Sequence, residues 1–136
     1  MRLAAISLLA VTLVGCGAHH ASPESVARAW TAALNRDDSQ SAARLFAPGA
    51  QVVQGTTLTL HTHAQAVTWN AGLPCGGVIV SVQQQARNQV LVIFRLTGRP
   101  HHQCDGPGDG AAALFTVVNG KIVLWHETAV PRNNAI

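Results

Sequence analysis

The chain has 136 residues, a formal net charge of +3, and 48% hydrophobic against 11% charged residues. This length suits one domain with a single hydrophobic core. Its basic residues are scattered, without a run and without interleaved aromatic residues, and this pattern argues against nucleic acid as a partner.

The N-terminal segment combines a positive charge, a short apolar run and a cysteine. Arg2 precedes the run Leu3–Val14, and Gly15 supplies a small residue before Cys16. A transmembrane helix needs about 20 apolar residues, more than this run provides. The pattern is typical of a bacterial lipoprotein signal, so we expect cleavage before Cys16 and lipid on its thiol. The alternative is an ordinary cleaved signal peptide.

This interpretation sets the expected domain boundaries and location. Removing 15 residues from the 136 leaves a mature chain of 121. We expect a signal peptide over 1–15, a lipidated tether over 16–22, one domain over 23–130 and a polar, frayed tail over 131–136. The lipid would hold the protein to a bacterial membrane in the cell envelope, which in a diderm cell is the outer membrane facing the periplasm.

Three helices are expected in the N-terminal half. Ser22 is a favourable N-cap and Pro23 a favourable first helical residue. An apolar stripe at helical spacing then runs through Val26, Ala29, Trp30, Ala33 and Leu34. A second short helix is predicted to include Ala42, Leu45 and Phe46 and to end at Pro48 and Gly49, and a third to cover 62–71.

Strands are expected between and after these helices. Short strands are predicted at 50–54 and 57–61, and longer ones at 77–86, 90–97, 112–118 and 121–128. Asn119 and Gly120 form the strongest hairpin signal. Counting from this turn places Glu127 on one face with Trp125 and Leu114. The order predicts an α+β fold, a cone-shaped curved antiparallel sheet with three helices on its concave face.

Cys75 and Cys104 remain after the predicted lipidation site. An even number of cysteines in an exported chain favours one disulfide, with free thiols and metal ligation as alternatives. A turn at Arg87 and Asn88 would place Cys75 opposite Pro100, four residues from Cys104 in a loop that can fold back.

Three stretches carry a family resemblance: 26–35 with the following aspartates, 43–52, and the hairpin 119–127. They resemble the nuclear transport factor 2-like superfamily, which includes ketosteroid isomerases and SnoaL-like polyketide cyclases. The resemblance implies the cone-shaped fold. It also implies that Trp30 stands where the isomerases have a tyrosine acid and Gln54 about where they have an aspartate base. Because neither residue can replace those groups, isomerase chemistry is not expected.

Glu127 is the main candidate for chemistry, because it is the one acid on a predicted core strand and it matches the acidic end of the cyclase-like closing strand. His126 should face the other way. The candidate ligand-pocket residues are aromatic: Trp30, Phe46, Trp69, Phe94, Phe115 and Trp125. For each of these residues, a surface or core role is the alternative.

The remaining reactive residues indicate no cofactor or metal. His61, His63, His101 and His102 lack a recognised ligand spacing, and Cys104 is better explained by a disulfide. The leading function is therefore non-enzymatic binding of a small apolar ligand or a protein partner. The alternatives are a lyase, isomerase or hydrolase using Glu127, and an accessory module of an envelope assembly. Apolar residues on both sides of strand 90–97 favour a homodimer.

Overall fold

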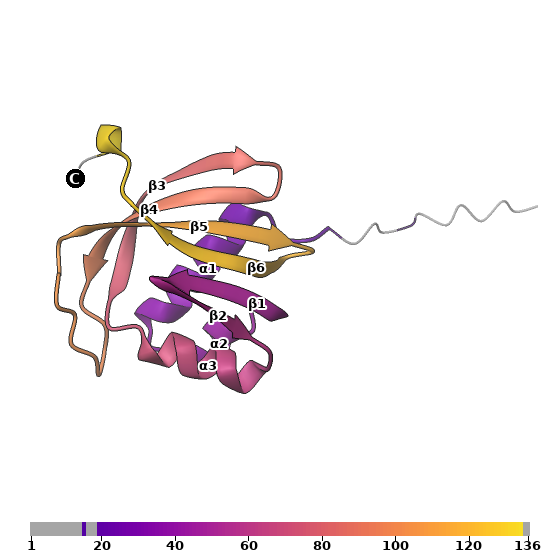
Figure 1. The fold of residues 1–136 in the computed structure, drawn as a ribbon, viewed down its shortest axis with the longest axis horizontal. Coiled ribbons are helices and arrows are strands. Elements are labelled where there is room, and N and C mark those ends of the chain that lie inside the picture. Colours follow the sequence, from indigo (N-terminus) through magenta and orange to yellow (C-terminus); the bar gives the residue numbers. More distant parts are fainter. Residues whose placement is uncertain (1–14, 16–18, 135–136) are drawn as a thin grey trace, which may run out of the picture.

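The computed structural model describes residue 15 and residues 19–134. Within them, three helices lie on one side of a six-stranded sheet (Figure 1). The helices are α1 (Pro23–Asn35), α2 (Ser39–Ala43) and α3 (His63–Gly72). The strands are β1 (Phe46–Gln54), β2 (Thr56–Leu60), β3 (Gly76–Ala86), β4 (Gln89–Thr97), β5 (Gly110–Val118) and β6 (Lys121–Thr128). The predicted α+β class and the three N-terminal helices are confirmed.

Local sequence accounts for where the first two helices begin. The Ser22 side chain accepts a hydrogen bond from the backbone N–H of Ser25, and Pro23 follows at the first helical position. Asp38 caps α2 and accepts from the backbone N–H of Ser41 at 2.9 Å. The hydroxyl and N–H of Ser41 hold the pKa of the Asp38 carboxyl below its usual range.

The strand order is β2-β1-β6-β5-β4-β3. All neighbouring pairs are antiparallel except β1 and β6, which are parallel. A parallel pair needs a long crossover connection, and here the intervening chain supplies α3 and the four strands β2, β3, β4 and β5. This pairing brings the end of β1 beside the end of β6, although the two are about half the chain apart.

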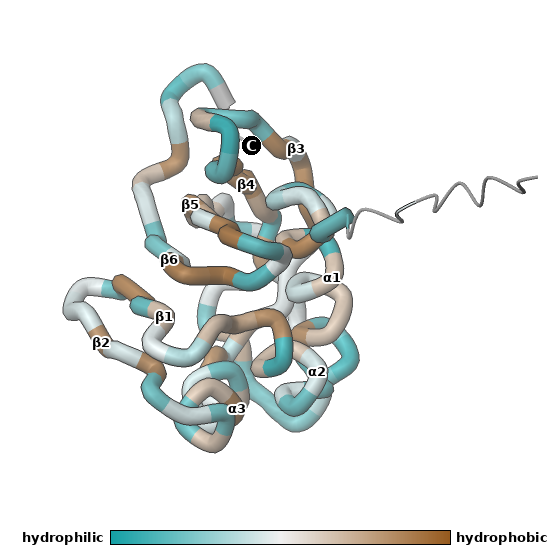
Figure 2. Tube along the Cα trace, turned by 90° about the vertical axis from the view of Figure 1, so that its right-hand side faces the viewer, coloured by the Kyte–Doolittle hydropathy of each residue, from teal (hydrophilic) through white to brown (hydrophobic). Residues whose placement is uncertain are grey.

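The core lies between the helices and the concave face of the sheet. It is contributed by α1, α2, α3 and every strand, and its centre is aromatic. Trp30 of α1 packs edge-on against Phe115 of β5, with ring centroids 5.4 Å apart. Figure 2 shows the apolar segments concentrated in the central strands, while the loops are largely hydrophilic.

One expected element differs from the structure. Phe46 to Gly49 belong to β1, not to a second helix, because this segment finds a partner in β6. The backbone N–H of Ile122 donates to Leu45 O at 2.8 Å, and Phe46 pairs with Ile122. The difference comes from a tertiary contact that local patterns do not contain. The segment predicted as a tail includes a short 3-10 helix over Arg132–Asn134.

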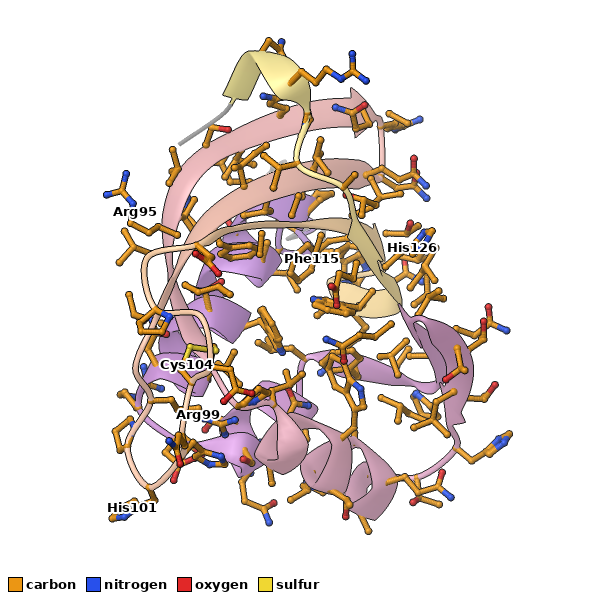
Figure 3. All side chains as sticks on the ribbon, turned by 60° about the vertical axis from the view of Figure 1, so that its left-hand side comes forward. Arg95, Arg99, His101, Cys104, Phe115 and His126 are labelled. Carbon is orange, nitrogen blue, oxygen red and sulfur yellow. A yellow bond between two sulfur atoms is a disulfide. The ribbon has the colours of Figure 1, made fainter. Side chains whose placement is uncertain are left out.

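The outer face of the sheet is partly covered by the chain itself. Ile93 and Ala112, paired across β4 and β5, are fully buried but lie outside the main core cluster. The C-terminal segment after β6 crosses this face toward β3 (Figures 1 and 3). Val78 and Val80 of β3 remain about half exposed. The apolar surface predicted for β4 is therefore smaller than the sequence indicates, since Ile93 is not available to a partner.

Candidate functional site

A cavity of about 150 Å³ opens between α1 and the sheet. Its wall is built from α1, the end of β1, the connection from α3 into β3, and the inner faces of β4, β5 and β6. The lining residues are Trp30, Thr31, Leu34, Gln54, Leu73, Pro74, Cys75, Gly76, Gly77, Phe94, Leu96, Ala111, Ala112, Ala113, Trp125 and Glu127. The wall is mainly apolar, with few polar groups, as small-molecule sites usually are.

The cavity exists because small residues of β5 and β3 occupy inward positions on either side of β4. Ala111 and Ala113 of β5 pair with Phe94 and Val92 of β4. On β3, a Cβ at Gly77 would lie 3.2 Å from the Phe94 ring, so any other residue there would force the ring to shift. Short side chains here leave a space that large apolar residues would have filled.

Aromatic rings form one side of this cavity. The ring centroid of Trp30 lies 6.5 Å from that of Phe94 and 5.9 Å from that of Trp125. The Trp30 indole N–H donates to Asn70 Oδ1 at 2.8 Å, which fixes the ring against α3. The Trp125 indole N–H is buried and has no partner among the described residues. The rings are held in place by packing and by this one hydrogen bond.

Two polar side chains stand at the open end of the cavity. In the parallel register, Val53 lies opposite His126, so Gln54 and Glu127 follow side by side on the cavity side. Both are exposed to solvent. Glu127 makes no ion pair or hydrogen bond within the described part of the chain. Among the described lining residues it is the only charged one.

The predicted environment of Glu127 is partly wrong. Trp125 and Glu127 share a face and His126 points to the other, as expected, but Trp125 pairs with Phe115 and His126 with Leu114. The prediction had placed Leu114, and not Phe115, on the same face as Trp125 and Glu127. Val123 of β6 is an unpaired bulge residue, because Thr116 pairs with Leu124 and Val117 with Ile122. The bulge shifts the register by one residue, and a one-residue shift moves every side chain to the opposite face.

The six aromatic residues proposed for the pocket divide into two groups. Trp30, Phe94 and Trp125 line the cavity. Phe115 is fully buried behind Trp30, and Phe46 and Trp69 pack on each other at the α3 side, with centroids 5.7 Å apart. The second group supports the wall from behind and does not form its surface.

A buried arginine fixes the loop at one end of the cavity. The Arg99 guanidinium donates to the carbonyl oxygens of Asn70 and Leu73 at 2.8 and 2.6 Å. It also forms an ion pair with Asp37 Oδ1 at 2.9 Å. The same carboxylate oxygen accepts a hydrogen bond from His102 Nε2, also at 2.9 Å. In the sequence, Arg99 is one of several scattered basic residues, and only its place between Gly98 and Pro100 distinguishes it.

The predicted disulfide is present. Cys75, in the cavity wall, is joined to Cys104 in the loop between β4 and β5, with a Cα–Cα distance of 4.7 Å. Figure 3 shows the bridge above Arg99. The predicted opposition of Cys75 and Pro100 is wrong, because two bulges in β3 shift the register and Gly76 pairs with Thr97.

The histidines do not converge on one point. His63 bonds Gln40 Oε1 and His102 bonds Asp37, at 2.9 Å in each case. Within the residues that the structure describes, no three histidine, cysteine, aspartate or glutamate side chains are placed to hold a metal ion.

Comparison with known proteins identifies relatives by structure alone. No family model and no curated protein matches the sequence. Among solved structures, an NTF2-like protein of unknown function from Cytophaga hutchinsonii matches with a TM-score of 0.65 and 14% identity, over 85% of this chain and 96% of that one. The fold is NTF2-like.

Two further structures carry functional descriptions. A candidate polyketide cyclase from Sinorhizobium meliloti matches with a TM-score of 0.63 and 17% identity, over 76% of this chain and 93% of that one. A hypothetical protein from Catenulispora acidiphila has a ketosteroid isomerase-like fold and was solved in complex with trimethylamine. It matches with a TM-score of 0.63 and 21% identity, over 80% of this chain and 87% of that one. At these identities the likeness shows the fold and not the activity.

The predicted signal peptide lies outside the described residues except for Gly15, and so does Cys16. None of the helices in the part of the chain that is described has the length and hydropathy to cross a membrane.

Proposed function

We propose that this protein binds a small apolar molecule in the cavity between α1 and the sheet, and that it does so while anchored in the bacterial envelope by lipid on Cys16. The observation that carries the proposal is the cavity itself, about 150 Å³ in volume and lined mainly by apolar side chains. An apolar cavity of about this volume takes up benzene in another protein. The size favours a ligand much smaller than a steroid.

Binding is favoured over catalysis by the composition of the wall. Acid–base chemistry on a carbon substrate needs a group that accepts a proton and one that stabilises or returns it. The described wall offers Glu127 alone, while Trp30 and Gln54 stand at the positions that the isomerase resemblance assigns to acid and base. A protein of the same fold is in complex with trimethylamine, a molecule small enough for this volume.

Benzene provides a direct test of the cavity. We expect it to bind the mature protein and to change the fluorescence of Trp30 and Trp125, two of the three tryptophans in a chain without tyrosine. Ala111→Leu places a larger side chain in the cavity and should weaken benzene binding by at least about tenfold. Ala32→Leu is the matched control, since Ala32 is exposed on α1 and does not line the cavity.

Titration calorimetry gives the affinities. If benzene does not bind, or binds Ala111→Leu as well as the unaltered protein, the cavity is not the binding site.

The proposed anchor is tested at Cys16. Cys16→Ser should abolish incorporation of labelled fatty acid and leave the signal peptide attached, because lipoprotein processing needs the thiol to carry diacylglycerol. Mass measurement of the protein extracted from a bacterial host distinguishes precursor from mature chain. A Cys16→Ser protein that is cleaved normally and stays with the membrane would contradict lipidation.

A further inference from the structure

We infer that the ligand is a cation, specifically a small alkylammonium compound whose charged nitrogen lies among the aromatic rings of the cavity and near Glu127. This inference rests on the proposed function and narrows it from an apolar ligand to one with an apolar surface and a positive charge. It is carried by the charge distribution of the wall, the type of its aromatic residues and the size of the space.

The charge distribution of the wall favours a cation over an anion. Glu127 is the single charged residue among the described lining residues, and no arginine, lysine or histidine lines the cavity. Arg99, the basic side chain that supports the loop, is turned toward Asp37 and two backbone carbonyls and does not reach the wall. The charge carried by the described wall is therefore negative, although the net charge of the whole chain is positive.

Glu127 is also free to act as a counter-charge. It has no cationic partner within the described residues, whereas Glu24, on α1, is paired with Arg28 at 2.8 Å. Because Glu127 stands at the open end, its carboxylate keeps its hydration until a ligand arrives, so the contribution to affinity is modest and weakens with salt.

The aromatic residues supply the second recognition element. Trp30, Trp125 and Phe94 present three rings to one space, and tryptophan faces bind cations better than other aromatic side chains. Alkylated ammonium groups suit such a site, since methyl or other alkyl groups cover their charged nitrogen. Removing them from water therefore costs less free energy than removing a bare ammonium. A primary ammonium would need several hydrogen-bond acceptors, and Gln54 and Glu127 offer their acceptor oxygens at the exposed end, away from the aromatic rings.

Choline and its carbon isostere, in which the quaternary nitrogen is replaced by a carbon atom, form a matched pair of probes. They have the same shape and hydroxyl group and differ in charge. We expect choline to bind the mature protein at least about tenfold more tightly than the isostere in low salt, as measured by titration calorimetry and tryptophan fluorescence.

Two variants assign this preference to particular residues. Glu127→Gln should reduce choline affinity about threefold to tenfold and leave the isostere unchanged. Glu24→Gln, which removes the same charge away from the cavity, should change neither. Trp125→Leu should lower the ratio of choline affinity to isostere affinity. This substitution leaves no hydrogen-bond acceptor unpaired, since the Trp125 N–H has no partner in the described chain.

Each outcome decides a different claim. Equal binding of the two probes overturns the cationic ligand while the cavity remains a binding site. Binding of neither probe, together with no benzene binding, overturns the proposed function as well. A choline preference that survives both Glu127→Gln and Trp125→Leu also overturns the inference, because the selectivity would then arise elsewhere.

Discussion

Replacing both Cys75 and Cys104 with serine is expected to lower the free energy of unfolding by about 3–4 kcal/mol. The bridge spans 29 residues and so restricts a long loop of the unfolded chain. A domain of this size has a total stability of about 5–15 kcal/mol, so the loss is a large part of it. Urea unfolding of the two proteins under oxidising conditions measures the difference.

Reductant provides the internal control. It should destabilise the unaltered protein by a similar amount and leave the double variant unchanged. Since Cys75 lines the cavity, the double variant should also bind benzene more weakly. Equal unfolding midpoints for the unaltered protein and the double variant under oxidising conditions would show that the loop is held by its hydrogen bonds alone. One of these bonds joins Gly108 N–H to Leu96 O at 2.8 Å.

The elements that sequence predicted well are those whose signals are local. The N-cap at Ser22 and the apolar stripe through Trp30 place α1 within a residue of its observed start. The turn at Asn119 and Gly120 joins β5 and β6 as expected, and both residues adopt positive φ, which asparagine and glycine tolerate. Local chemistry alone determines such features, so one sequence is enough to find them.

Register was harder to predict, because bulges leave little trace in a sequence. Two bulges in β3 and one in β6, at Val123, each insert an unpaired residue. Pairs near a turn are therefore predicted correctly, as with Ala86 and Gln89, whereas pairs far from it are displaced. This displacement explains both errors, the partner of Trp125 and the residue opposite Cys75.

The candidate site was predictable in its large residues and not in its small ones. Trp30, Trp125 and Glu127 were identified by residue type and by the face of the element on which they lie, and they line the cavity. Ala111 and Gly77 create the space, but an alanine or glycine in a strand carries no sign of whether the facing element fills the gap. Cavity volume is a property of packing between elements distant in sequence.

Replacing Arg99 with methionine is expected to lower the free energy of unfolding by about 3 kcal/mol. The side chain is completely buried, and its loss would remove the Arg99 donor from the carbonyl oxygen of Leu73 and the arginine partner from Asp37. It would leave the carbonyl oxygen of Asn70 with only the Leu73 N–H, at 3.4 Å. Asp37 keeps some contact with water and with His102, which limits the cost. The wall of the cavity should loosen as well, because Asn70 accepts from the Trp30 indole.

Arg95→Met is the matched control, since Arg95 is exposed on β4 and points away from the sheet (Figure 3). It should change stability by less than about 0.5 kcal/mol. Arg99→Lys should fall between the two, because an ammonium keeps the charge but cannot reach two carbonyls and a carboxylate at once. Equal stability of Arg99→Met and Arg95→Met would show that the buried guanidinium gains no more from its partners than it loses in hydration, so that methionine replaces it without net cost.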